Sequence, residues 1–261
     1  MVNKNPIGFF DSGVGQISIL KEVEKLLPNE SYVVLADEKH LPFGEKSKDS
    51  IEKYTGQAAS FLIKTHKIKI LVVACNTASV QALAHIRKYF EIPVVGTVPA
   101  IKPAFLKSKN KKITILATTA TTKSDYLQNL VSIYAPGAKI QKIACPGLEE
   151  AIEKRNTLKI KHLVSGYAAK IQEFGSDALV LGCTHYPLIK KIFKQYLRKT
   201  VVIIDSSQGI AKKVKSDLKN MDALSDTDGF NYFYTTGNAE MFSQSCSFYL
   251  KREVVAKKIE L

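Results

Sequence analysis

The chain has 261 residues, of which 45% are hydrophobic and 24% charged, and its formal net charge is +14. This length suits two domains of roughly 100–150 residues each, and the composition excludes a disordered, collagen-like or coiled-coil protein. The longest apolar runs, such as 70–75, are far shorter than the roughly 20 residues that a transmembrane helix needs. The first residues also lack the pattern of a secretory signal peptide. We therefore expect a globular cytoplasmic protein without a membrane partner.

The predicted elements alternate between strands and helices along the whole chain. Short apolar runs bounded by turn residues indicate buried strands, and longer runs with apolar residues at helical spacing indicate helices. This alternation favours parallel sheets covered by helices on both faces. The predicted strands are 7–10, 32–36, 69–74, 93–96, 112–117, 140–144, 178–182, 201–204 and 230–236. The predicted helices are 17–27, 50–66, 77–90, 123–134, further helices ending at 174, then 187–197, 210–218 and 239–250.

The series of elements starts again near the middle of the chain. Segments 71–77 and 179–185 share one form: an apolar strand, a cysteine, and two polar residues that begin a helix. Cys75 follows Asp11 by 64 positions, and Cys183 follows Thr118 by 65. The pseudo-repeat predicts two similar lobes, each with a cysteine at the carboxyl end of a strand, where open α/β sheets bind ligands.

Two thiols in matching loops suit one reaction especially well. If the lobes face each other, Cys75 and Cys183 flank a ligand, so that one thiol removes a proton from a carbon and the other returns one to its opposite face. That reaction is racemisation. A helix N-terminus can lower the pKa of a thiol, and the helices that begin at Asn76-Thr77 and at Thr184 offer N–H groups and hydroxyls to carboxylates. The alternative is a chance likeness of two buried strands whose cysteines pack as small apolar residues.

Two further side chains are placed to assist the thiols. Asp11 lies in the first strand–helix turn, near a cysteine on a neighbouring strand, and its carboxylate can accept or stabilise a proton; a helix N-cap is the alternative. His185 follows Cys183 by two residues and can serve it, unless it is a structural histidine. The glycines after Asp11 match a dinucleotide-binding fingerprint weakly, because Ser18 stands at the third glycine position.

The positive charge and the remaining cysteines have simpler explanations. An excess of lysine can indicate nucleic acid, a membrane surface or an anionic substrate. The densest lysine runs, 107–112 and 190–199, provide no platform for stacking bases, so we favour a solvated basic surface over nucleic-acid binding. The four cysteines are far apart and lack zinc-ligand spacing, so we expect reduced thiols and no metal. Cys145 and Cys246 are predicted to be packing residues.

Signature motifs extend almost from end to end of the chain. With them, the chain closely resembles the cofactor-independent aspartate/glutamate racemase superfamily, and in particular its glutamate racemases. Three features depart from the usual pattern: Phe43 replaces a tyrosine, Gln16 replaces a third glycine, and the loop after Gly96 has TVPAI (97–101) without the usual glutamate. The motifs are FDSGVG (10–15), PFG (42–44), ACNTAS (74–79), ATTAT (117–121), KS (123–124), LGCTHYP (181–187), DS (205–206) and TG (236–237).

The resemblance implies an α/β fold of two similar lobes, each a mostly parallel sheet flanked by helices. The lobes would be related by a pseudo-twofold axis, with the active site between them. One lobe would comprise 1–96 with 206–261 and hold Asp11 and Cys75; the other would comprise 97–205 and hold Cys183 and His185. The implied activity is the racemisation of L-glutamate to D-glutamate for bacterial peptidoglycan, without a cofactor, with a homodimer as one compatible assembly.

The resemblance also implies roles for individual residues. Cys75 and Cys183 would be the acid/base pair, with Asp11 assisting Cys75, His185 assisting Cys183, and Cys75 taking the proton from D-glutamate. Glu153 matches an acidic position of the family near the site. The substrate site would be lined by Asp11, Ser12, Phe43, Gly44, Asn76, Thr77, Thr118, Thr121, Thr184 and His185.

Other functions stay open at this stage. A racemase for aspartate or another acidic compound would use the same two thiols. A thiol hydrolase would use Cys183 with His185, form an acyl-enzyme and leave Cys75 dispensable. A nucleic-acid-binding protein would bind tightly at low salt and weakly at high salt.

Overall fold

The computed structural model describes residues 5–226 and 229–261, and the chain divides into two compact units. Unit 1 comprises Met1–Thr97 and Ser207–Leu261, and unit 2 comprises Val98–Ser206. Each unit has its own sheet, and the strand pairs in both sheets are parallel. The predicted parallel α/β class is therefore confirmed.

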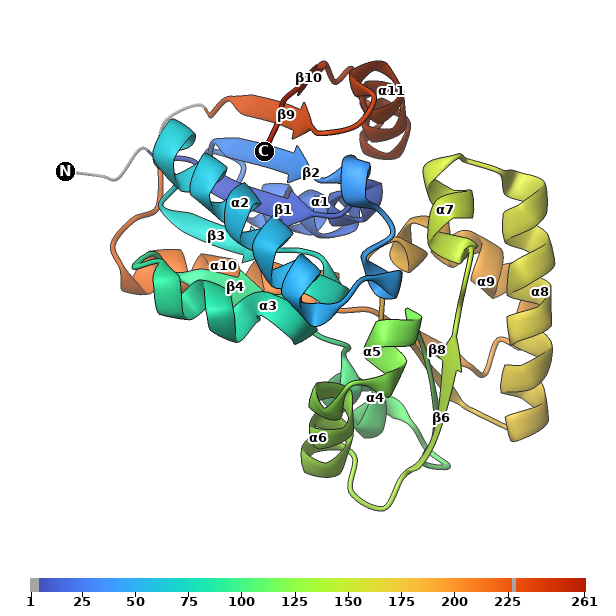
Figure 1. Ribbon diagram of the computed structural model, residues 1–261. Helices are drawn as coiled ribbons and strands as arrows, with labels where there is room; N and C mark the ends of the chain where they lie inside the picture. The colour runs from blue at the N-terminus through green and yellow to red at the C-terminus, as the bar shows by residue number, and fades with distance from the viewer. Residues whose placement is uncertain (1–4, 227–228) are drawn as a thin grey trace. The chain divides into compact units, whose positions relative to one another are not determined.

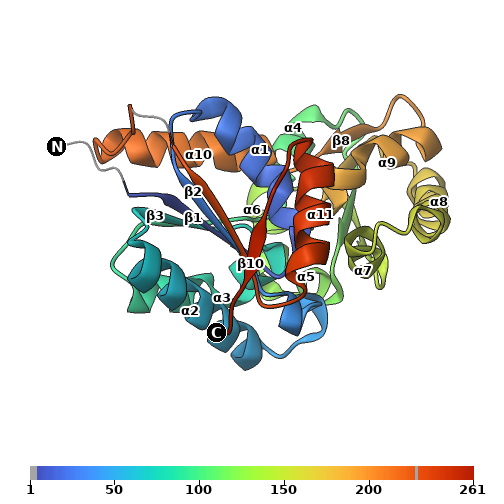
Figure 2. The same ribbon diagram turned by 90° about the horizontal axis from the view of Figure 1, so that it is seen from above.

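Unit 1 is built on a six-stranded sheet with the order β10-β9-β2-β1-β3-β4. Its central strands are apolar and buried on both faces, because helices cover both sides. The strands are β1 (Ile7–Asp11), β2 (Tyr32–Ala36), β3 (Ile70–Val73), β4 (Val94–Gly96), β9 (Asn231–Thr235) and β10 (Ala256–Lys258). Helices α2 (Lys48–His66) and α3 (Asn76–Tyr89) cover one face, and α1 (Ile17–Leu26) and α10 (Ser207–Asn220) cover the other, with α11 (Ala239–Leu250) beside α1 (Figures 1 and 2).

A buried ion pair joins three segments at the amino ends of these strands. Lys69 Nζ, just before β3, lies 2.7 Å from Glu30 Oε2, and both side chains are almost fully buried. The same ammonium donates to the carbonyl oxygen of Ala223 at 2.6 Å. Glu30 Oε1 in turn accepts a hydrogen bond of 2.9 Å from the backbone N–H of Ser225. These contacts attach the segment after α10 to the amino ends of the strands, at the end of the sheet opposite to Cys75.

Unit 2 has a four-stranded sheet with the order β6-β5-β7-β8. Apolar residues of α4 and α6 pack on one face of this sheet in a single core cluster, and α7, α8 and α9 lie on the other side (Figure 1). The strands are β5 (Lys112–Ala117), β6 (Lys139–Ala144), β7 (Ala178–Leu181) and β8 (Val202–Ile204). The helices are α4 (Ile101–Lys107), α5 (Thr119–Lys123), α6 (Asp125–Tyr134), α7 (Leu148–Glu153), α8 (Thr157–Phe174) and α9 (Lys190–Tyr196).

The pseudo-repeat appears in the strand order of the two sheets. The order β2-β1-β3-β4 in unit 1 corresponds to β6-β5-β7-β8 in unit 2. After β3, Ala74 N donates to Phe10 O at 2.7 Å, and after β7, Gly182 N donates to Leu116 O at the same distance. The next residue in each case is a cysteine. Cys75 and Cys183 therefore occupy equivalent positions at the carboxyl ends of equivalent strands.

Several short elements differ from the sequence-based prediction. Helix α4 was not predicted, because it contains Pro103; the proline is tolerated because it lies in the first turn, where backbone N–H groups have no intrahelical partner. Strand β10 was missed because it is a short edge strand with two exposed lysines. The helix predicted over 187–197 is instead a 3-10 turn (Tyr186–Ile189) followed by α9.

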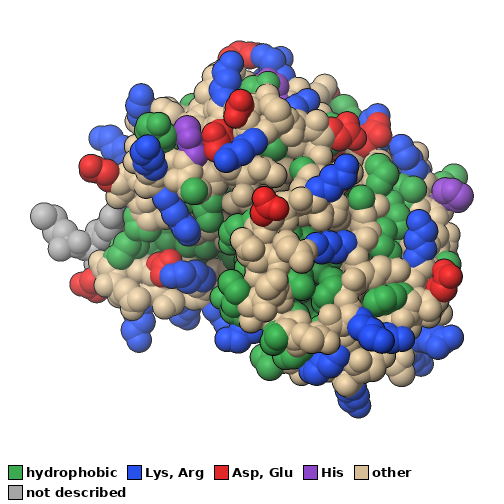
Figure 3. Space-filling view, turned by 60° about the horizontal axis from the view of Figure 1, so that its bottom comes forward, with side chains coloured by type: hydrophobic (Ala, Val, Ile, Leu, Met, Phe, Trp, Pro, Cys, Tyr) green, Lys and Arg blue, Asp and Glu red, His purple; other side chains and the backbone are tan. Residues whose placement is uncertain are grey.

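Helix lengths and the distribution of surface charge can be described for most of the chain. Among the residues that the structure describes, no helix is both long and apolar enough to cross a membrane. Lysine and arginine side chains are dispersed over the face shown in Figure 3, where acidic and hydrophobic side chains lie among them.

Candidate active site

Cys75 forms the N-cap of α3, a helix of 14 residues. Its Sγ accepts a hydrogen bond of 3.4 Å from the backbone N–H of Ala78, and the side chain is almost completely buried. The positive end of a helix dipole and a donated N–H both favour a thiolate over a thiol. The expected position of this cysteine at a helix N-terminus is therefore present.

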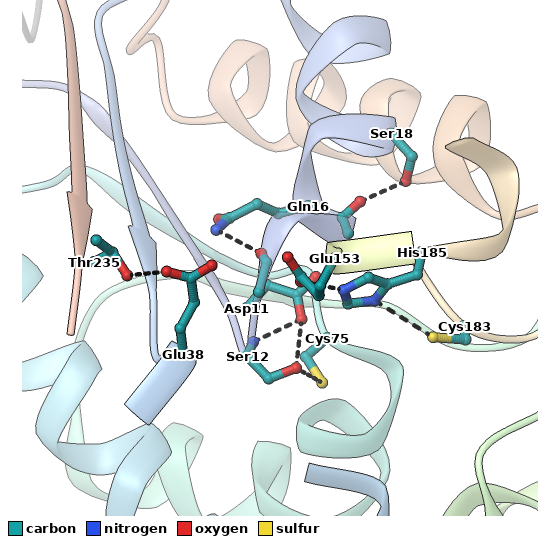
Figure 4. A network of polar contacts seen from close by, with 12 residues as sticks. Asp11, Ser12, Gln16, Ser18, Glu38, Cys75, Glu153, Cys183, His185 and Thr235 are labelled. Carbon is teal, nitrogen blue, oxygen red and sulfur yellow. Dashed lines mark hydrogen bonds and ion pairs between the residues drawn. The ribbon is translucent and has the colours of Figure 1, made fainter. Parts of the chain in front are cut away.

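Asp11 is linked to Cys75 through Ser12. Asp11 Oδ1 accepts from the backbone N–H of Ser12 at 2.7 Å and from its hydroxyl at 3.3 Å, and Ser12 Oγ lies 3.8 Å from Cys75 Sγ (Figure 4). Asp11 is the last residue of β1 and is fully buried. The N-cap of the next helix, a 3-10 turn at Val14–Gln16, is Gly13, so the helix-cap alternative for Asp11 is wrong.

Gln16 holds the turn that follows Asp11, a role that was not predicted from the sequence. Its Nε2 donates to the carbonyl oxygen of Gly13 at 3.2 Å and to that of Leu35 in β2 at 3.1 Å. The side chain is fully buried. A long amide at this position thus ties the turn of Asp11 and Ser12 to the neighbouring strand, which a glycine could not do.

Cys183 belongs to a chain of three side chains in unit 2. His185 Nδ1 lies 3.7 Å from Cys183 Sγ, and His185 Nε2 lies 2.6 Å from Glu153 Oε1 (Figure 4). Burial alone lowers the pKa of the His185 imidazole, but its hydrogen bonds with Cys183 and Glu153 outweigh that effect and raise the pKa well above its usual value. His185 is therefore a partner of the thiol, and Glu153 stabilises its protonated form.

The environment of Cys183 corrects one expectation from the sequence. Cys183 does not begin a long helix, because a 3-10 turn (Tyr186–Ile189) follows it. Burial raises the pKa of the Cys183 thiol; the hydrogen bond and charge of His185 oppose the rise, and the charge of Glu149 adds to it. The hydrogen bond and charge of His185 thus act against the effect of burial on this thiol.

Gly182 is required for the close approach of β7 to β5 just before this cysteine. A Cβ atom at this position would lie 2.9 Å from the carbonyl oxygen of Leu116. The hydrogen bond from Gly182 N to that oxygen places Cys183 at the carboxyl ends of β5 and β7.

The other predicted site residues lie in the loops at the carboxyl ends of the two sheets. Thr118 is the N-cap of α5, accepting from the N–H of Thr121 at 3.3 Å and donating to its hydroxyl at 3.0 Å. Phe43 stands where the family usually has a tyrosine. Its ring is fully buried in the core of unit 1 and does not face solvent. Seven of these residues are buried, namely Ser12, Gly44, Asn76, Thr77, Thr118, Thr121 and Thr184.

The two remaining cysteines are also buried. Burial raises the pKa of Cys145 to about 12, so this thiol stays protonated, and Cys246 is fully buried in α11. Over residues 5–226 and 229–261, no group of three or more His, Cys, Asp or Glu side chains is arranged to hold a metal ion.

The fold and the paired cysteine loops define a class of racemase. The sequence model of the Asp/Glu/Hydantoin racemase family matches residues 17–214, and the chain belongs to this family. Among individual proteins, it is similar to the glutamate racemase of Clostridium botulinum (strain Kyoto / Type A2), with 40% identity over 231 residues that cover 85% of this chain and 87% of the relative. The glutamate racemase of Roseiflexus sp. (strain RS-1) is 38% identical over 247 residues, covering 91% and 89%.

Solved structures agree with this placement. The glutamate racemase isoform RacE1 from Bacillus anthracis superposes with a TM-score of 0.89 at 30% identity and covers 98% of both chains. The Escherichia coli glutamate racemase, solved with L-glutamate and the activator UDP-MurNAc-ala, has a TM-score of 0.84 at 30% identity and covers 94% of this chain and 95% of its own. The aspartate racemase of Picrophilus torridus shares the fold at 17% identity with a TM-score of 0.57.

Proposed function

We propose that this protein interconverts L- and D-glutamate by a two-thiol mechanism in which Cys75 and Cys183 are the acid/base pair. The observation that carries the proposal is their equivalence: each thiol lies two residues beyond the matching strand of a sheet with the same strand order. Each also has its own polar partners, Asp11 and Ser12 for Cys75 and His185 for Cys183. The lobes proposed from the sequence, 1–96 with 206–261 and 97–205, would each supply one thiol.

The proposed proton transfers balance in both directions. With D-glutamate, the thiolate of Cys75 removes the α-proton, and the electron pair of the broken C–H bond is delocalised into the α-carboxylate. The thiol of Cys183 then donates its proton to the opposite face of the α-carbon, which yields L-glutamate, a thiol at Cys75 and a thiolate at Cys183. The reverse sequence converts L-glutamate to D-glutamate.

The unequal environments of the thiols suit this division of work. The N–H donated at the N-terminus of α3 would stabilise the thiolate of Cys75, and burial raises the pKa of Cys183. In that state the protein is ready to accept D-glutamate. When Cys183 becomes a thiolate, the protonated imidazole of His185, 3.7 Å away, stabilises the new charge.

The carboxylates of the substrate would be bound by neutral donors. We assign this role to the residues that begin the helices and turns after the cysteines and after β5, together with the turn that holds Phe43 and Gly44. Hydroxyl, amide and backbone N–H groups at such positions can donate hydrogen bonds to carboxylates. The proposed donors are Ser12, Asn76, Thr77, Thr118, Thr121 and Thr184.

The cellular role that we propose is the supply of D-glutamate for bacterial peptidoglycan, in the cytoplasm. Relatives named glutamate racemase at 38–40% identity over most of the chain support glutamate as the substrate. An aspartate racemase is a weaker candidate, since the solved aspartate racemase shares only the fold with this chain at 17% identity.

The test is the exchange of the α-hydrogen of L-glutamate in D2O by the purified protein without added cofactor. We expect deuterium at the α-carbon and a decay of optical rotation to zero, with much slower turnover of L-aspartate. Retention of both the α-hydrogen and the rotation would refute the proposal. Exchange with aspartate alone would instead identify the other acidic substrate, and ester or amide cleavage that persists in Cys75→Ala would identify a thiol hydrolase.

A further inference from the structure

A second polar cluster lies beside Asp11 at the carboxyl end of β2. Asp37 is fully buried, and its backbone N–H donates to the carbonyl oxygen of Asp11 at 2.9 Å. Its two carboxylate oxygens lie 3.0 and 2.9 Å from Nδ1 of His40. Oδ1 also accepts from the hydroxyl of Thr236 at 2.7 Å. The carboxylate is thus anchored on β2 and on the residue after β9, and it holds the imidazole from one side.

The flat face of the same imidazole contacts a row of aromatic rings. The rings of His40 and Tyr54 are stacked, with centroids 3.7 Å apart and an angle of 8° between their planes. Tyr54 in α2 lies 6.2 Å from Phe43, and Phe43 lies 6.1 Å from Phe10 in β1. His40 therefore connects the anchored carboxylate to the rings that surround Phe43.

We propose that His40 is a positioning residue that fixes the Phe43–Gly44 segment in its substrate-binding conformation. This inference rests on the proposed function, in which that segment lines the substrate site. His40 and Phe43 belong to one loop between β2 and α2, and His40 attaches this loop both to Asp37 and to Tyr54. Without the ring, the loop would gain conformational freedom that substrate binding must then remove, so affinity would fall while proton transfer, once substrate is bound, would proceed as before.

The proposed role of His40 needs a planar group that donates a hydrogen bond, so substitutions that keep or remove such a group should have different effects. An arginine guanidinium can donate to a carboxylate and stack on an aromatic ring at the same time. An alanine does neither. His40→Arg should therefore preserve the position of the loop, whereas His40→Ala should not.

His85 provides a matched control in the same unit. It also lies near a carboxylate, with Nδ1 3.7 Å from Glu52 Oε2, and near an aromatic ring, with its centroid 4.5 Å from that of Tyr89. It lies in the second half of α3, and these contacts join it to α2 and α3 rather than to the loop of Phe43. His85→Ala removes a histidine with similar surroundings, and we expect substrate affinity to stay unchanged.

The experiment measures kcat and KM for both enantiomers of glutamate, together with thermal unfolding, in the full chain. We expect KM to rise about fivefold in His40→Ala for both enantiomers with kcat changed less than about twofold. Tyr54→Leu, which removes the stacked ring, should have the same effect. His40→Arg should return KM to within about twofold of wild type, and His85→Ala should leave it unchanged.

Three outcomes would overturn the inference. One is an unchanged KM in a folded His40→Ala, another is an equal rise in His85→Ala, and the third is a His40→Arg variant that regains thermal stability but not KM. Failure of the inference is distinguishable from failure of the proposed function, because the latter requires that wild type itself does not racemise glutamate.

Discussion

The imidazole of His185 connects a carboxylate to a thiol: Nε2 lies 2.6 Å from Glu153 Oε1, and Nδ1 lies 3.7 Å from Cys183 Sγ. The ring is almost completely buried, and burial alone would disfavour its protonated form. The hydrogen bonds and charges of Cys183 and Glu153 reverse this effect and raise the pKa of the ring well above its usual value. Glu153 is therefore, with Cys183, one of the two groups that raise the pKa of this imidazole.

This contact makes the stability of the protein depend on pH above neutrality. The raised pKa of His185 means that its contribution to folding is complete below the unfolded value near 6.5 and is lost as pH rises through the folded value. We expect the unfolding temperature of wild type to fall between pH 6.5 and 8, and to fall less steeply in Glu153→Gln. Cys75 and its surroundings are the same in wild type and Glu153→Gln, so the difference between the two slopes reports on the imidazole of His185.

The control is Glu150→Gln on the same helix. Glu150 is an exposed carboxylate whose pKa is lowered by its hydrogen bonds with Lys154 and Lys159, so it remains ionised across this range. Its variant should keep the wild-type slope in thermal unfolding measured at steps of half a pH unit. Identical slopes for wild type and Glu153→Gln would show that Glu153 does not stabilise the imidazolium.

The four cysteines allow a test of the thiol assignment with a control in each unit. Cys75→Ala and Cys183→Ala should each reduce racemisation by a factor of at least about 10², because in the proposed mechanism each removes the proton carrier for one face of the α-carbon. Cys246→Ala in unit 1 and Cys145→Ala in unit 2 should retain most of the activity, since both thiols are packing groups. Polarimetry with each enantiomer measures the rates. Substantial activity in Cys75→Ala would exclude the two-thiol mechanism.

Much of this arrangement could be predicted from local sequence. Strands such as β2 and β3 consist of apolar residues buried on both faces, and their composition alone indicates a covered parallel sheet. The equivalence of Cys75 and Cys183 was visible because the repeat preserves the order of a strand, a cysteine and polar residues.

Contacts between distant segments could not be predicted in the same way. The carboxylate of Glu153 reaches His185 across 32 positions, and Thr236 reaches Asp37 across 199. Such pairs depend on how α7 and β9 pack against other elements, and no periodicity in the sequence encodes that packing. The raised pKa of Cys183 was missed for the same reason, because burial by the folded chain outweighs the local pattern.

The buried pair of Lys69 and Glu30 predicts a large effect on stability and a small one on catalysis. Lys69→Met leaves the Glu30 carboxylate buried without its cation, which should lower the free energy of unfolding by about 3–5 kcal/mol. The exposed pair of Lys25 and Glu22 is the control, and Lys25→Met should cost at most about 1 kcal/mol. Urea unfolding measures both. KM for glutamate should not change in either variant, because Lys69 lies at the amino end of β3, and a decrease of less than about 1 kcal/mol in Lys69→Met would contradict the argument.

The last prediction assigns each helper to its thiol. Because the enantiomers have equal free energy, kcat/KM is the same in both directions for every variant, so rate constants alone cannot separate the two transfers. The effect of α-deuterium on kcat/KM can separate them, since in the proposed mechanism the labelled hydrogen of D-glutamate is transferred to Cys75 and that of L-glutamate to Cys183. A variant that slows transfer at one thiol makes that step more rate-limiting, and this raises the isotope effect for one enantiomer and lowers it for the other.

Asp11→Asn should therefore raise the isotope effect for D-glutamate and lower it for L-glutamate. Ser12→Ala should act in the same direction, because Ser12 Oγ lies between Asp11 Oδ1 and Cys75 Sγ at 3.3 and 3.8 Å. His185→Asn should show the opposite pattern, since its ring contacts Cys183. Competitive measurements with α-deuterated substrate give both effects from one preparation of each variant. If Asp11→Asn and His185→Asn each raise both effects together, the transfers are concerted, and if the two patterns are reversed, the helpers are exchanged. Either result would show that the separate roles assigned to Asp11 and His185 are wrong.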